Sequence, residues 1–580
     1  YGKLVGGYFA DHPGINDPHP NVQKGIVTRT AEKHPSVNFL PESWERTDEW
    51  YSYKKVNPDT KKLLMLDESS YQGGLDMGEH PIAWYHDFDG GRAFYTGGGH
   101  TKESYQEEDF LKHLLAGIQY AIGENLELDY TAATSKRAPE ENRFTKTYLS
   151  MGEFTEPTEM TILPNLDILV AQRRGEILYF NNETEKLEEV AKLNVYWKSE
   201  VPGVNAEEGL MGIQKDPNYA SNNFVFVYYS PAGDAEINRL SRFVFKDGVW
   251  DMSSEKVILD VASDRNICCH TGGSIAFDKD GNLYLSTGDN STPFNQNDSQ
   301  YVLSGFAPLD GREGRKQWDA RRSSGNSNDL RGKILRIKVQ DDGSYTIPAG
   351  NLYPEGTANT RPEIYVQGNR NPYRIAVDQK TGFLYWGEVG PDASNDSLDT
   401  KGPRGYDEVN QARTAGNFGW PYAIGNNYTY FEYDYAAGKS GLKFDPAKPV
   451  NNSPHNTGLK ELPATQAAFI WYPYAASPDF PQVGTGGRNA MAGPVYYSDL
   501  YQSEGKMPDY FDGKLFIYDW IRGWVKVVTM EENGDFSKME PFMPNTKFNS
   551  LIDMEMGPDG KIYILEYGNG WFSKNSDAGL

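Results

Sequence analysis

A histidine and an aspartate stand where the two strands of one predicted β-hairpin come together. His270 lies between a pair of adjacent cysteines and the sequence Thr-Gly-Gly, and Asp289 lies downstream in the sequence Gly-Asp-Asn. Because paired strands bring such positions close, we expect Asp289 to hydrogen-bond the imidazole and to orient it as a general base. The alternative is a histidine with a purely structural role.

Further polar groups precede and follow the next hairpin. The sequence Gly-Asn-Arg-Asn-Pro carries Arg370 and Asn371, and a guanidinium offers a planar fork for a carboxylate or a carbonyl group. The backbone carbonyls of Gly390 and Pro391 are placed to point at a hard cation such as Ca²⁺. An acidic cluster and a tight aromatic turn follow, at residues 407–410 (Asp-Glu-Val-Asn) and 416–421 (Gly-Asn-Phe-Gly-Trp-Pro).

Short β-hairpins, repeated along most of the chain, must position these residues. Each copy joins two short strands through a turn that contains Gly, Asn or Pro. The copies occupy residues 160–170, 211–229, 275–285, 375–385, 495–517 and 554–564. Hairpins at blade-sized intervals predict a six-bladed β-propeller over residues 146–580, and the number of matches disfavours a β-sandwich.

Long segments separate some of the copies, and we expect them to crowd the mouth of the propeller channel. They span residues 291–329, 393–402 and 425–482. Long loops in a compact domain are usually functional or disordered. The third segment is rich in Tyr, Trp and Phe, which either stack on sugars or pack the insertion itself.

The first 125 residues follow a different pattern. Residues 63–67 and 90–96 read as strands, the second of these leads into a glycine loop, and residues 107–122 read as a helix. This order predicts a partial α/β domain over residues 1–125. Residues 126–145 are charged and aperiodic, so they are interpreted as a linker. The residues at helical spacing are Phe110, Leu111, Leu114, Leu115 and Ile118.

Composition narrows the possible partners and compartments. The 57 basic and 81 acidic residues give a net charge of −24, which argues against nucleic acid or anionic lipid as a partner. No apolar run approaches the roughly 20 residues that span a bilayer. The chain begins at Tyr1 and not at Met, so we expect it to start inside a longer precursor.

The chain has two cysteines, Cys268 and Cys269, and they are adjacent. This arrangement excludes a disulfide framework and the CxxC motifs of zinc, redox and haem sites. In an oxidising compartment the pair forms either a vicinal disulfide, which would stiffen the backbone beside His270, or two free thiols.

Taken in order, these motifs resemble the soluble pyrroloquinoline quinone (PQQ)-dependent glucose/sorbosone dehydrogenases, over about three quarters of the chain. The motifs are HxGG and GD in the third copy, followed by GKILRI, GNRNP, GP, DEVN and GNFGWP. The resemblance implies a six-bladed propeller with PQQ and Ca²⁺ at the channel mouth. It also implies that His270 takes the proton of a sugar hydroxyl during hydride transfer and that Asp289 is its partner.

The same resemblance assigns the cofactor contacts. Arg370 and Asn371 match residues that contact the cofactor, and Arg370 would polarise the quinone. The carbonyls of Gly390 and Pro391 match Ca²⁺ ligands. Glu207, just before the sequence Gly-Leu-Met-Gly, matches another polar residue that contacts the cofactor.

The last two blades depart from this family pattern. PQQ carries three carboxylates, and the family binds them with basic residues that this chain replaces by Ile521 and by Ser-Leu-Ile at residues 550–552. A charged cofactor short of partners is costly to bury. Arg374, Arg488 and Arg522 are candidates to compensate, and Arg522, next to Ile521, is the predicted contact. If none of them does so, the propeller is a catalytically degenerate one that binds glycan or a protein partner.

The first domain resembles the ThuA (trehalose utilisation) family, whose fold is flavodoxin-like and related to class I glutamine amidotransferases. The matching sequences are Gly-Tyr-Phe at 7–9, His-Pro-Ile-Ala-Trp at 80–84, Gly-Arg-Ala-Phe-Tyr at 91–95, Gly-His at 99–100 and Phe-Leu-Lys-His-Leu at 110–114. No cysteine nucleophile is present in residues 1–125, which excludes thiol amidotransferase chemistry there. His100 is either a site residue for a sugar or a structural loop residue.

Fusions of these two domains resemble Bacteroidota-type envelope proteins. The resemblance therefore implies an extracytoplasmic protein of the periplasm, outer membrane or cell surface. Its expected substrate is a small sugar or other carbohydrate. Its expected partners are an envelope protein complex or a cytochrome c that accepts electrons. The prediction as a whole is a mainly β protein, a six-bladed propeller preceded by a partial flavodoxin-like domain.

Overall fold

The computed structural model describes residues 2–123, 138–202, 204, 206–294 and 305–580. The chain divides into two compact units, Tyr1–Ala138 and Pro139–Leu580. The predicted linker, residues 126–145, lies outside the described residues as far as residue 137. Within the described ranges, no helix is long and apolar enough to cross a membrane.

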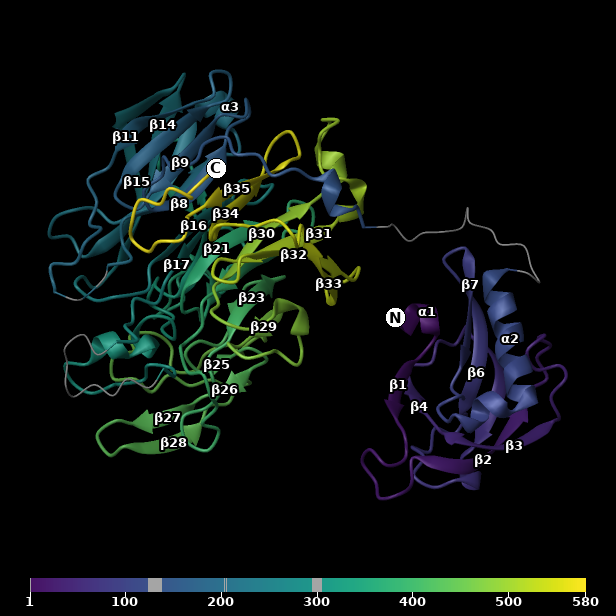
Figure 1. The fold of residues 1–580 in the computed structure, drawn as a ribbon. Helices are drawn as coiled ribbons and strands as arrows, with labels where there is room; N and C mark the ends of the chain where they lie inside the picture. Colours follow the sequence, from purple (N-terminus) through teal and green to yellow (C-terminus); the bar gives the residue numbers. More distant parts are fainter. Residues whose placement is uncertain (1, 124–137, 203, 205, 295–304) are drawn as a thin grey trace. The chain divides into compact units, whose positions relative to one another are not determined.

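The larger unit contains six sheets that form the blades of a propeller (Figure 1). The first two are β8 (Pro157–Ile162), β9 (Ile168–Gln172), β10 (Glu176–Asn181) and β11 (Lys186–Lys192), then β12 (Leu210–Lys215), β13 (Phe224–Tyr229), β14 (Ile237–Lys246) and β15 (Val249–Ala262). The third and fourth are β16 (Gly272–Phe277), β17 (Leu283–Thr287), β18 (Lys333–Val339) and β20 (Ile364–Gln367), then β21 (Pro372–Val377), β22 (Leu384–Glu388), β23 (Asp407–Ala412) and β29 (Ile470–Tyr472). The fifth is β30 (Ala490–Tyr496), β31 (Lys514–Asp519), β32 (Trp524–Met530) and β33 (Phe536–Phe542), and the sixth is β34 (Leu551–Met556) with β35 (Ile562–Glu566).

The first strand of every blade lies around the central channel. β8 contacts β12, β12 contacts β16, β16 contacts β21, β21 contacts β30, β30 contacts β34, and β34 returns to β8. The six predicted hairpins are the first two strands of the six blades, so the propeller prediction is confirmed. Ring closure leaves no inner strand at an open edge of the fold.

One buried arginine connects three blades across this ring. The residue Arg374 is only 1% exposed. Its Nε donates to the carbonyl of Ile552 at 2.9 Å, and its Nη2 donates to the carbonyl of Thr158. The guanidinium also lies 3.7 Å from the carboxylates of Glu159 and Asp553. A single cation on β21 therefore holds β8 and β34, the strands that close the propeller.

Glu159 extends this network to the remaining early blades. Its carboxylate accepts hydrogen bonds from the backbone N–H of Ile213 at 2.8 Å and from the hydroxyl of Ser274 at 2.5 Å. Burial raises the pKa of Glu159 to about 8, although the nearby charge of Arg374 opposes this rise. The ionised form of Glu159 consequently depends on Arg374 and on these donors.

Two small hairpins lie in the insertion between β23 and β29: β25 (Ala423–Ile424) with β26 (Tyr428–Thr429), and β27 (Phe431–Asp434) with β28 (Lys439–Lys443). The aromatic residues Trp420, Tyr422, Tyr430 and Phe444 are buried together in one core cluster. These four side chains therefore pack the insertion and its surroundings and do not form an exposed stacking surface.

The smaller unit is an antiparallel sheet with one long helix. Its strand order is β3 (Ser43–Glu49), β2 (Val22–Arg29), β5 (Lys61–Asp67), β6 (Pro81–Phe88) and β7 (Gly91–Thr96), and β1 (Tyr8–Asp11) pairs with β4 (Ser52–Lys54). The predicted strands at 63–67 and 90–96 are β5 and β7. All these pairs are antiparallel, whereas a flavodoxin-like sheet is parallel. The two-residue connection between β6 and β7 can form only a hairpin, because a parallel crossover needs a dozen or more residues.

The predicted helix is α2 (Glu108–Ile122), but it buries a face different from its apolar stripe. Phe110, His113, Gly117 and Tyr120 are the buried residues, while Leu111, Leu115 and Ile118 are 42% to 56% exposed. At Gly117 an added Cβ would lie 2.2 Å from the ring of Phe94. The helix therefore approaches β7 closely through a glycine, and this contact sets which face is buried.

Replacing Arg374 by methionine should destabilise the propeller strongly. The substitution leaves Glu159 and Asp553 buried without their cation, a loss of about 3–5 kcal/mol in the free energy of unfolding. Urea denaturation measures it. Arg413→Met is the matched control, because Arg413 pairs with the exposed Asp535 and should change stability by less than about 1 kcal/mol. Equal midpoints for the two variants would contradict the role assigned to Arg374.

Candidate active site

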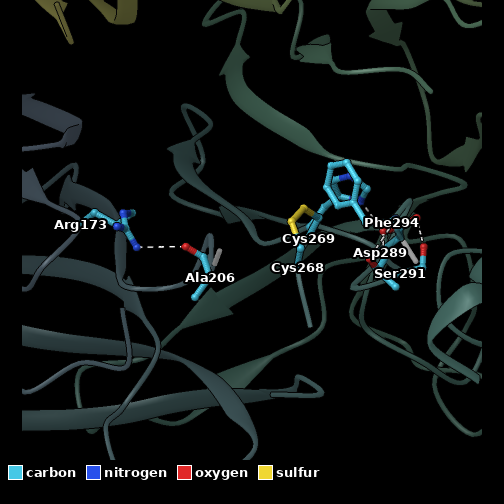
Figure 2. The surroundings of a disulfide bond; sticks show 9 residues. Arg173, Ala206, Cys268, Cys269, Asp289, Ser291 and Phe294 are labelled. Atoms are coloured by element: carbon cyan, nitrogen blue, oxygen red, sulfur yellow. Dashed lines mark hydrogen bonds and ion pairs between the residues drawn. A yellow bond between two sulfur atoms is a disulfide. The ribbon is translucent and has the colours of Figure 1, made fainter. Parts of the chain in front are cut away.

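His270 and Asp289 form a buried pair at the ends of β16 and β17. The Nδ1 atom of His270 lies 2.7 Å from Oδ1 of Asp289, and the two residues are 6% and 0% exposed. The carboxylate also accepts the N–H and hydroxyl of Ser291, at 3.0 and 2.6 Å, and Nε1–H of Trp420 at 2.9 Å. Asp289 thus has four donors that fix it beneath the imidazole; Figure 2 shows it next to Ser291.

The hairpin backbone brings the two side chains together. β16 and β17 pair antiparallel, and beyond their ends the N–H of Asn290 donates to the carbonyl of His270 at 3.2 Å. An added Cβ at Gly288 would lie 2.3 Å from the His270 carbonyl. Glycine at this position is therefore required for the close approach that the sequence motif Gly-Asp-Asn predicted.

The surroundings keep Asp289 ionised. Burial alone would raise the pKa of Asp289, but the neighbouring His270 and the hydrogen bonds to the carboxylate hold that pKa below its usual value of 3.8. A carboxylate can only accept a hydrogen bond, so the proton of the neutral imidazole lies on Nδ1. The lone pair on Nε2 is then available to accept a proton, as a general base requires.

Arg370 lies beside this pair. Its backbone carbonyl accepts the N–H of Asp289 at 2.8 Å, and its Nη1 donates to the carbonyl of Val389 at 2.9 Å. Among the residues that the structure describes, no carboxylate forms an ion pair with this guanidinium. Asn371 acts on the hairpin itself, because its Oδ1 accepts the N–H of Gly272 at 3.1 Å. Arg370 is thus a cation with unused capacity, and Asn371 is a positioning residue.

The imidazole and the guanidinium line one small cleft of about 10 Å³, which has room for about one water molecule. Its lining residues are His270, Ser291, Pro293, Gly305, Phe306, Pro308, Arg370, Pro391 and Asp392. The structure therefore brings together His270, Arg370 and Pro391 from the predicted set, with Asp289 directly behind His270.

Gly390 and Pro391 lie in the predicted place, but Pro391 is already engaged. Its carbonyl accepts Nη2–H of Arg488 at 2.5 Å. Arg488, which is 4% exposed, also forms an ion pair with Asp407, and the N–H of Gly390 donates to Asp407 at 3.0 Å. A Ca²⁺ ion on the Pro391 carbonyl would lie next to a guanidinium, so this carbonyl does not fit the predicted metal site.

Arg522, the predicted cofactor contact, lies outside the cleft lining. Its guanidinium donates to carbonyls of the segment 473–487, namely those of Pro473, Val483, Gly484, Gly486 and Gly487. These bonds use the donors that a cofactor carboxylate would need. Arg374 is likewise occupied by its contacts with Glu159, Asp553 and the backbone around the central channel. Counting arginines in the sequence therefore overestimates the cations available to a ligand.

Cys268 and Cys269 form a vicinal disulfide immediately before His270 (Figure 2). Both residues are 7% exposed and pack against Val204. A carboxylate oxygen of Glu207 lies within 4.8 Å of both sulfur atoms. Glu207 is thus beside the disulfide and is not among the cleft-lining residues.

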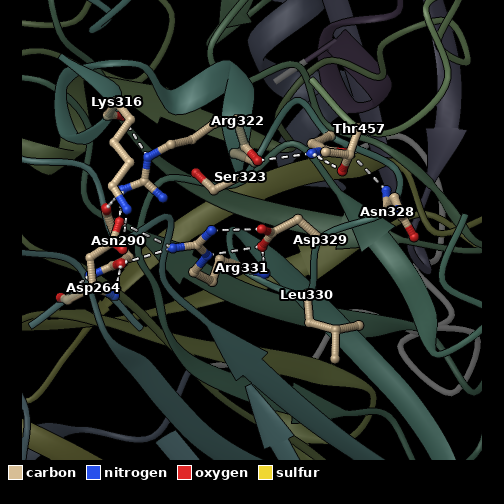
Figure 3. Close-up of polar contacts among 12 residues, drawn as sticks. Asp264, Asn290, Lys316, Arg322, Ser323, Asn328, Asp329, Leu330, Arg331 and Thr457 are labelled. Atoms are coloured by element: carbon tan, nitrogen blue, oxygen red, sulfur yellow. Dashed lines mark hydrogen bonds and ion pairs between the residues drawn. The ribbon is translucent and has the colours of Figure 1, made fainter. Parts of the chain in front are cut away.

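A charged network behind the site escaped the sequence analysis (Figure 3). Arg322 donates to the carbonyl of Asn290 at 2.5 Å, and Arg331 donates to the Asn290 side chain at 3.0 Å. Both arginines also lie within 4 Å of Asp264. They hold the residue that follows Asp289. Arg322 belongs to the long segment 291–329, where no periodicity indicates a functional residue. Trp420 lies in a motif that the sequence offered, but that motif was interpreted only as a tight aromatic turn.

Comparisons with known proteins place the two parts of the chain in two families. A sequence profile described as "Glucose / Sorbosone dehydrogenase" matches residues 154–459, and one described as "Trehalose utilisation" (ThuA) matches residues 1–121. The chain is 24% identical to aldose sugar dehydrogenase YliI of Escherichia coli over 70% of this chain and 86% of that protein. It is 24% identical to quinoprotein glucose dehydrogenase B of Acinetobacter calcoaceticus over 62% of this chain and 73% of that protein. The solved apo structure of the soluble aldose sugar dehydrogenase of E. coli is similar with a TM-score of 0.47 at 20% identity, over 75% of this chain and 97% of that one.

The ionised state of Asp289 predicts how stability depends on pH. A carboxyl group whose folded pKa is depressed stabilises the fold above its unfolded pKa, and this contribution is lost as the pH falls through the folded pKa. Asp289→Asn should therefore cost about 2 kcal/mol at pH 7, and the difference from the wild type should shrink as the pH falls from about 5. Urea denaturation at several pH values measures the difference. The exposed Asp479→Asn control should show little difference at any pH, and a difference for Asp289→Asn that does not shrink in acid would contradict this prediction.

The contact between Arg488 and Pro391 predicts that calcium does not bind at this carbonyl in the wild type. In Arg488→Met the carbonyl is freed and Asp407 loses its cation, so a calcium site of oxygen ligands becomes available. Millimolar CaCl₂ should raise the Tm of Arg488→Met and leave the wild type and the Arg413→Met control unchanged. A calcium-dependent rise in Tm that is as large in the wild type as in Arg488→Met would show that Arg488 does not exclude the ion.

Proposed function

Because this chain belongs to the glucose/sorbosone dehydrogenase family, we propose that its propeller oxidises a sugar hydroxyl to a carbonyl with a quinone cofactor. The observation that carries the proposal is the cleft that His270, hydrogen-bonded to an ionised Asp289, shares with the guanidinium of Arg370, which forms no ion pair with a carboxylate of the described residues. The removal of a hydroxyl proton requires a base, and the polarisation of a quinone carbonyl requires a cation, and this cleft holds both.

In this proposal His270 is the catalytic base. Nε2 accepts the hydroxyl proton of the sugar, and the resulting imidazolium is stabilised by Asp289 through Nδ1–H. Trp420 and Ser291 keep the carboxylate in place through their hydrogen bonds. These three residues therefore set the orientation of the imidazole before the substrate arrives.

A PQQ molecule bound in the cleft would supply the acceptor for the hydride. Arg370 fits such a group, because its guanidinium lies in the cleft with no ion pair among the described residues and can bind a carboxylate or a quinone carbonyl. Gly390 remains a possible carbonyl ligand for calcium, but Pro391 is held by Arg488. The proposal therefore assigns PQQ to this cleft, which must widen to admit it, and does not route any step through Ca²⁺.

A second candidate is a propeller that binds a glycan or a protein partner without redox turnover. The observation in its favour is the loss of cations on the last two blades. Ile521 is 46% exposed where the family has a basic residue, and Arg522 beside it is saturated by backbone carbonyls. Under this alternative the cleft keeps its shape but does not retain a cofactor with three carboxylates.

We also propose that the protein works outside the cytoplasm. The vicinal disulfide supports this location, since disulfides persist in oxidising compartments and are rare in the cytosol. A dehydrogenase there passes its electrons to a soluble acceptor, a cytochrome c or a protein of an envelope complex.

Sugar-dependent dye reduction tests the dehydrogenase proposal. The purified chain is incubated with PQQ, with and without Ca²⁺, and then with glucose and an electron-accepting dye. His270→Ala should lower kcat by about 10²–10⁴-fold, because it removes the base. His19→Ala, in the smaller unit, is the matched control and should leave kcat unchanged. Failure of PQQ to bind would overturn the proposal, and binding without turnover would favour the degenerate propeller.

A further inference from the structure

The backbone that leads into His270 lacks hydrogen bonds of its own. Among the residues that the structure describes, none exchanges a backbone hydrogen bond with residues 267–269. The first such bond after them is made by the carbonyl of His270, which accepts the N–H of Asn290 at 3.2 Å. The segment just before the base is therefore restrained mainly through the side chains of Cys268 and Cys269, which form a disulfide (Figure 2).

The disulfide restricts the backbone of both cysteines. Because Cys268 and Cys269 are adjacent in the chain, the bond between their sulfur atoms closes a ring that includes the peptide between them. Cys269 has a φ of 70°, which lies in the left-handed region that residues with a Cβ rarely adopt. Once the ring is open, Cys269 is free to leave this region for a more stable conformation. The ring therefore helps to set the direction in which the chain delivers His270 to Asp289.

A carboxylate lies beside the two sulfur atoms. One oxygen of Glu207 is within 4.8 Å of both Sγ atoms, and no Lys or Arg of the described residues forms an ion pair with this carboxylate. A negative charge disfavours a neighbouring thiolate, so the two thiols that reduction forms here would stay protonated. The thiolate is the form that reacts with an oxidant. Glu207 would therefore slow reoxidation and let a reduced form persist.

We propose that the Cys268–Cys269 disulfide is a redox switch that controls the position of His270. In the oxidised chain the ring holds the imidazole against Asp289. Reduction opens the ring, residues 267–269 relax, and the imidazole moves away from the carboxylate. The consequence for turnover rests on the proposed function, whereas the movement of His270 does not.

The electron donor of this switch is a dithiol. One thiolate of the donor attacks a cysteine sulfur, the Sγ–Sγ bond breaks, and a mixed disulfide forms with one cysteine while the other leaves as a thiol. The second thiolate of the donor then displaces the first cysteine. Two electrons and two protons thus pass to the cysteines, which become two thiols, while the donor becomes a disulfide.

Labelling of His270 with diethyl pyrocarbonate tests the switch without any cofactor. The whole chain is treated with dithiothreitol, and alkylation followed by mass spectrometry counts the free thiols. Reduction should raise the rate at which His270 is modified at least about fivefold, because the buried imidazole becomes accessible. The rate at His100, whose side chain is 45% exposed, should not change. His455, in the propeller unit, should also keep its rate and so show that the propeller stays folded.

Two results of this labelling would overturn the proposal. One is an unchanged rate at His270 in the fully reduced chain. The other is a disulfide that dithiothreitol reduces only under conditions in which His455 becomes reactive as well, because reduction would then require unfolding of the propeller.

Variants separate the disulfide from its neighbours. The double variant Cys268→Ala/Cys269→Ala should give His270 the reactivity of the reduced wild type, with or without dithiothreitol. Glu207→Gln should let the reduced chain reoxidise at least about threefold faster, because the thiols lose the neighbouring negative charge. Glu200→Gln is the matched control, since Glu200 is exposed and lies outside this group. Equal rates of reoxidation for the two variants would overturn the role assigned to Glu207.

Dye reduction in the presence of PQQ and glucose gives the functional readout. Reduction of the disulfide should lower kcat at least about tenfold, and reoxidation should restore it. Turnover that is unchanged in the fully reduced chain would overturn the switch. If the oxidised chain shows no turnover, the proposed function fails, and the labelling of His270 still decides whether the switch exists.

Discussion

The propeller depends on a charge buried at its centre. Arg374 of β21 reaches the carbonyls of β8 and β34 and lies near the carboxylates of Glu159 and Asp553. Glu159 in turn binds groups on β12 and β16. Buried charges of this kind are tolerated only when they are paired and hydrogen-bonded. These contacts therefore fix the positions of the five inner strands β8, β12, β16, β21 and β34 relative to one another. These contacts also fix the candidate active site, because His270 lies two residues before β16 and Arg370 two residues before β21.

At the mouth, Asp289 couples the third and fourth blades. It orients His270 through its side chain and binds the carbonyl of Arg370 through its backbone. Trp420, which comes from beyond β23, supplies a further donor. One residue therefore sets the distance between the base and the cation of the cleft. Arg322 and Arg331 bind the adjacent Asn290. The geometry of the His270–Asp289 pair therefore depends on segments outside the β16–β17 hairpin.

The arginines show why a residue type alone does not define a binding site. Arg374, Arg488 and Arg522 all carry the charge that an anionic cofactor needs. In the folded chain the first is committed to the channel, the second to Asp407 and Pro391, and the third to five backbone carbonyls. Arg370 keeps unused donors at the cleft. The availability of a cation is a property of its neighbours, because each occupied donor would have to be released before a ligand could use it.

The sequence by itself determined the repeated hairpins, and with them the six blades and the pairing of His270 with Asp289. Strand alternation and turn residues are local, and two residues at the paired ends of one hairpin have little freedom to separate. Only the tertiary structure decided that α2 buries Phe110 and Gly117 and exposes Leu111, that Trp420 binds Asp289, and that Arg488 occupies the Pro391 carbonyl. Each of these contacts joins residues from separate elements or from segments far apart in the chain. Their partners are chosen by packing and hydrogen-bond satisfaction across the fold, which no local pattern encodes.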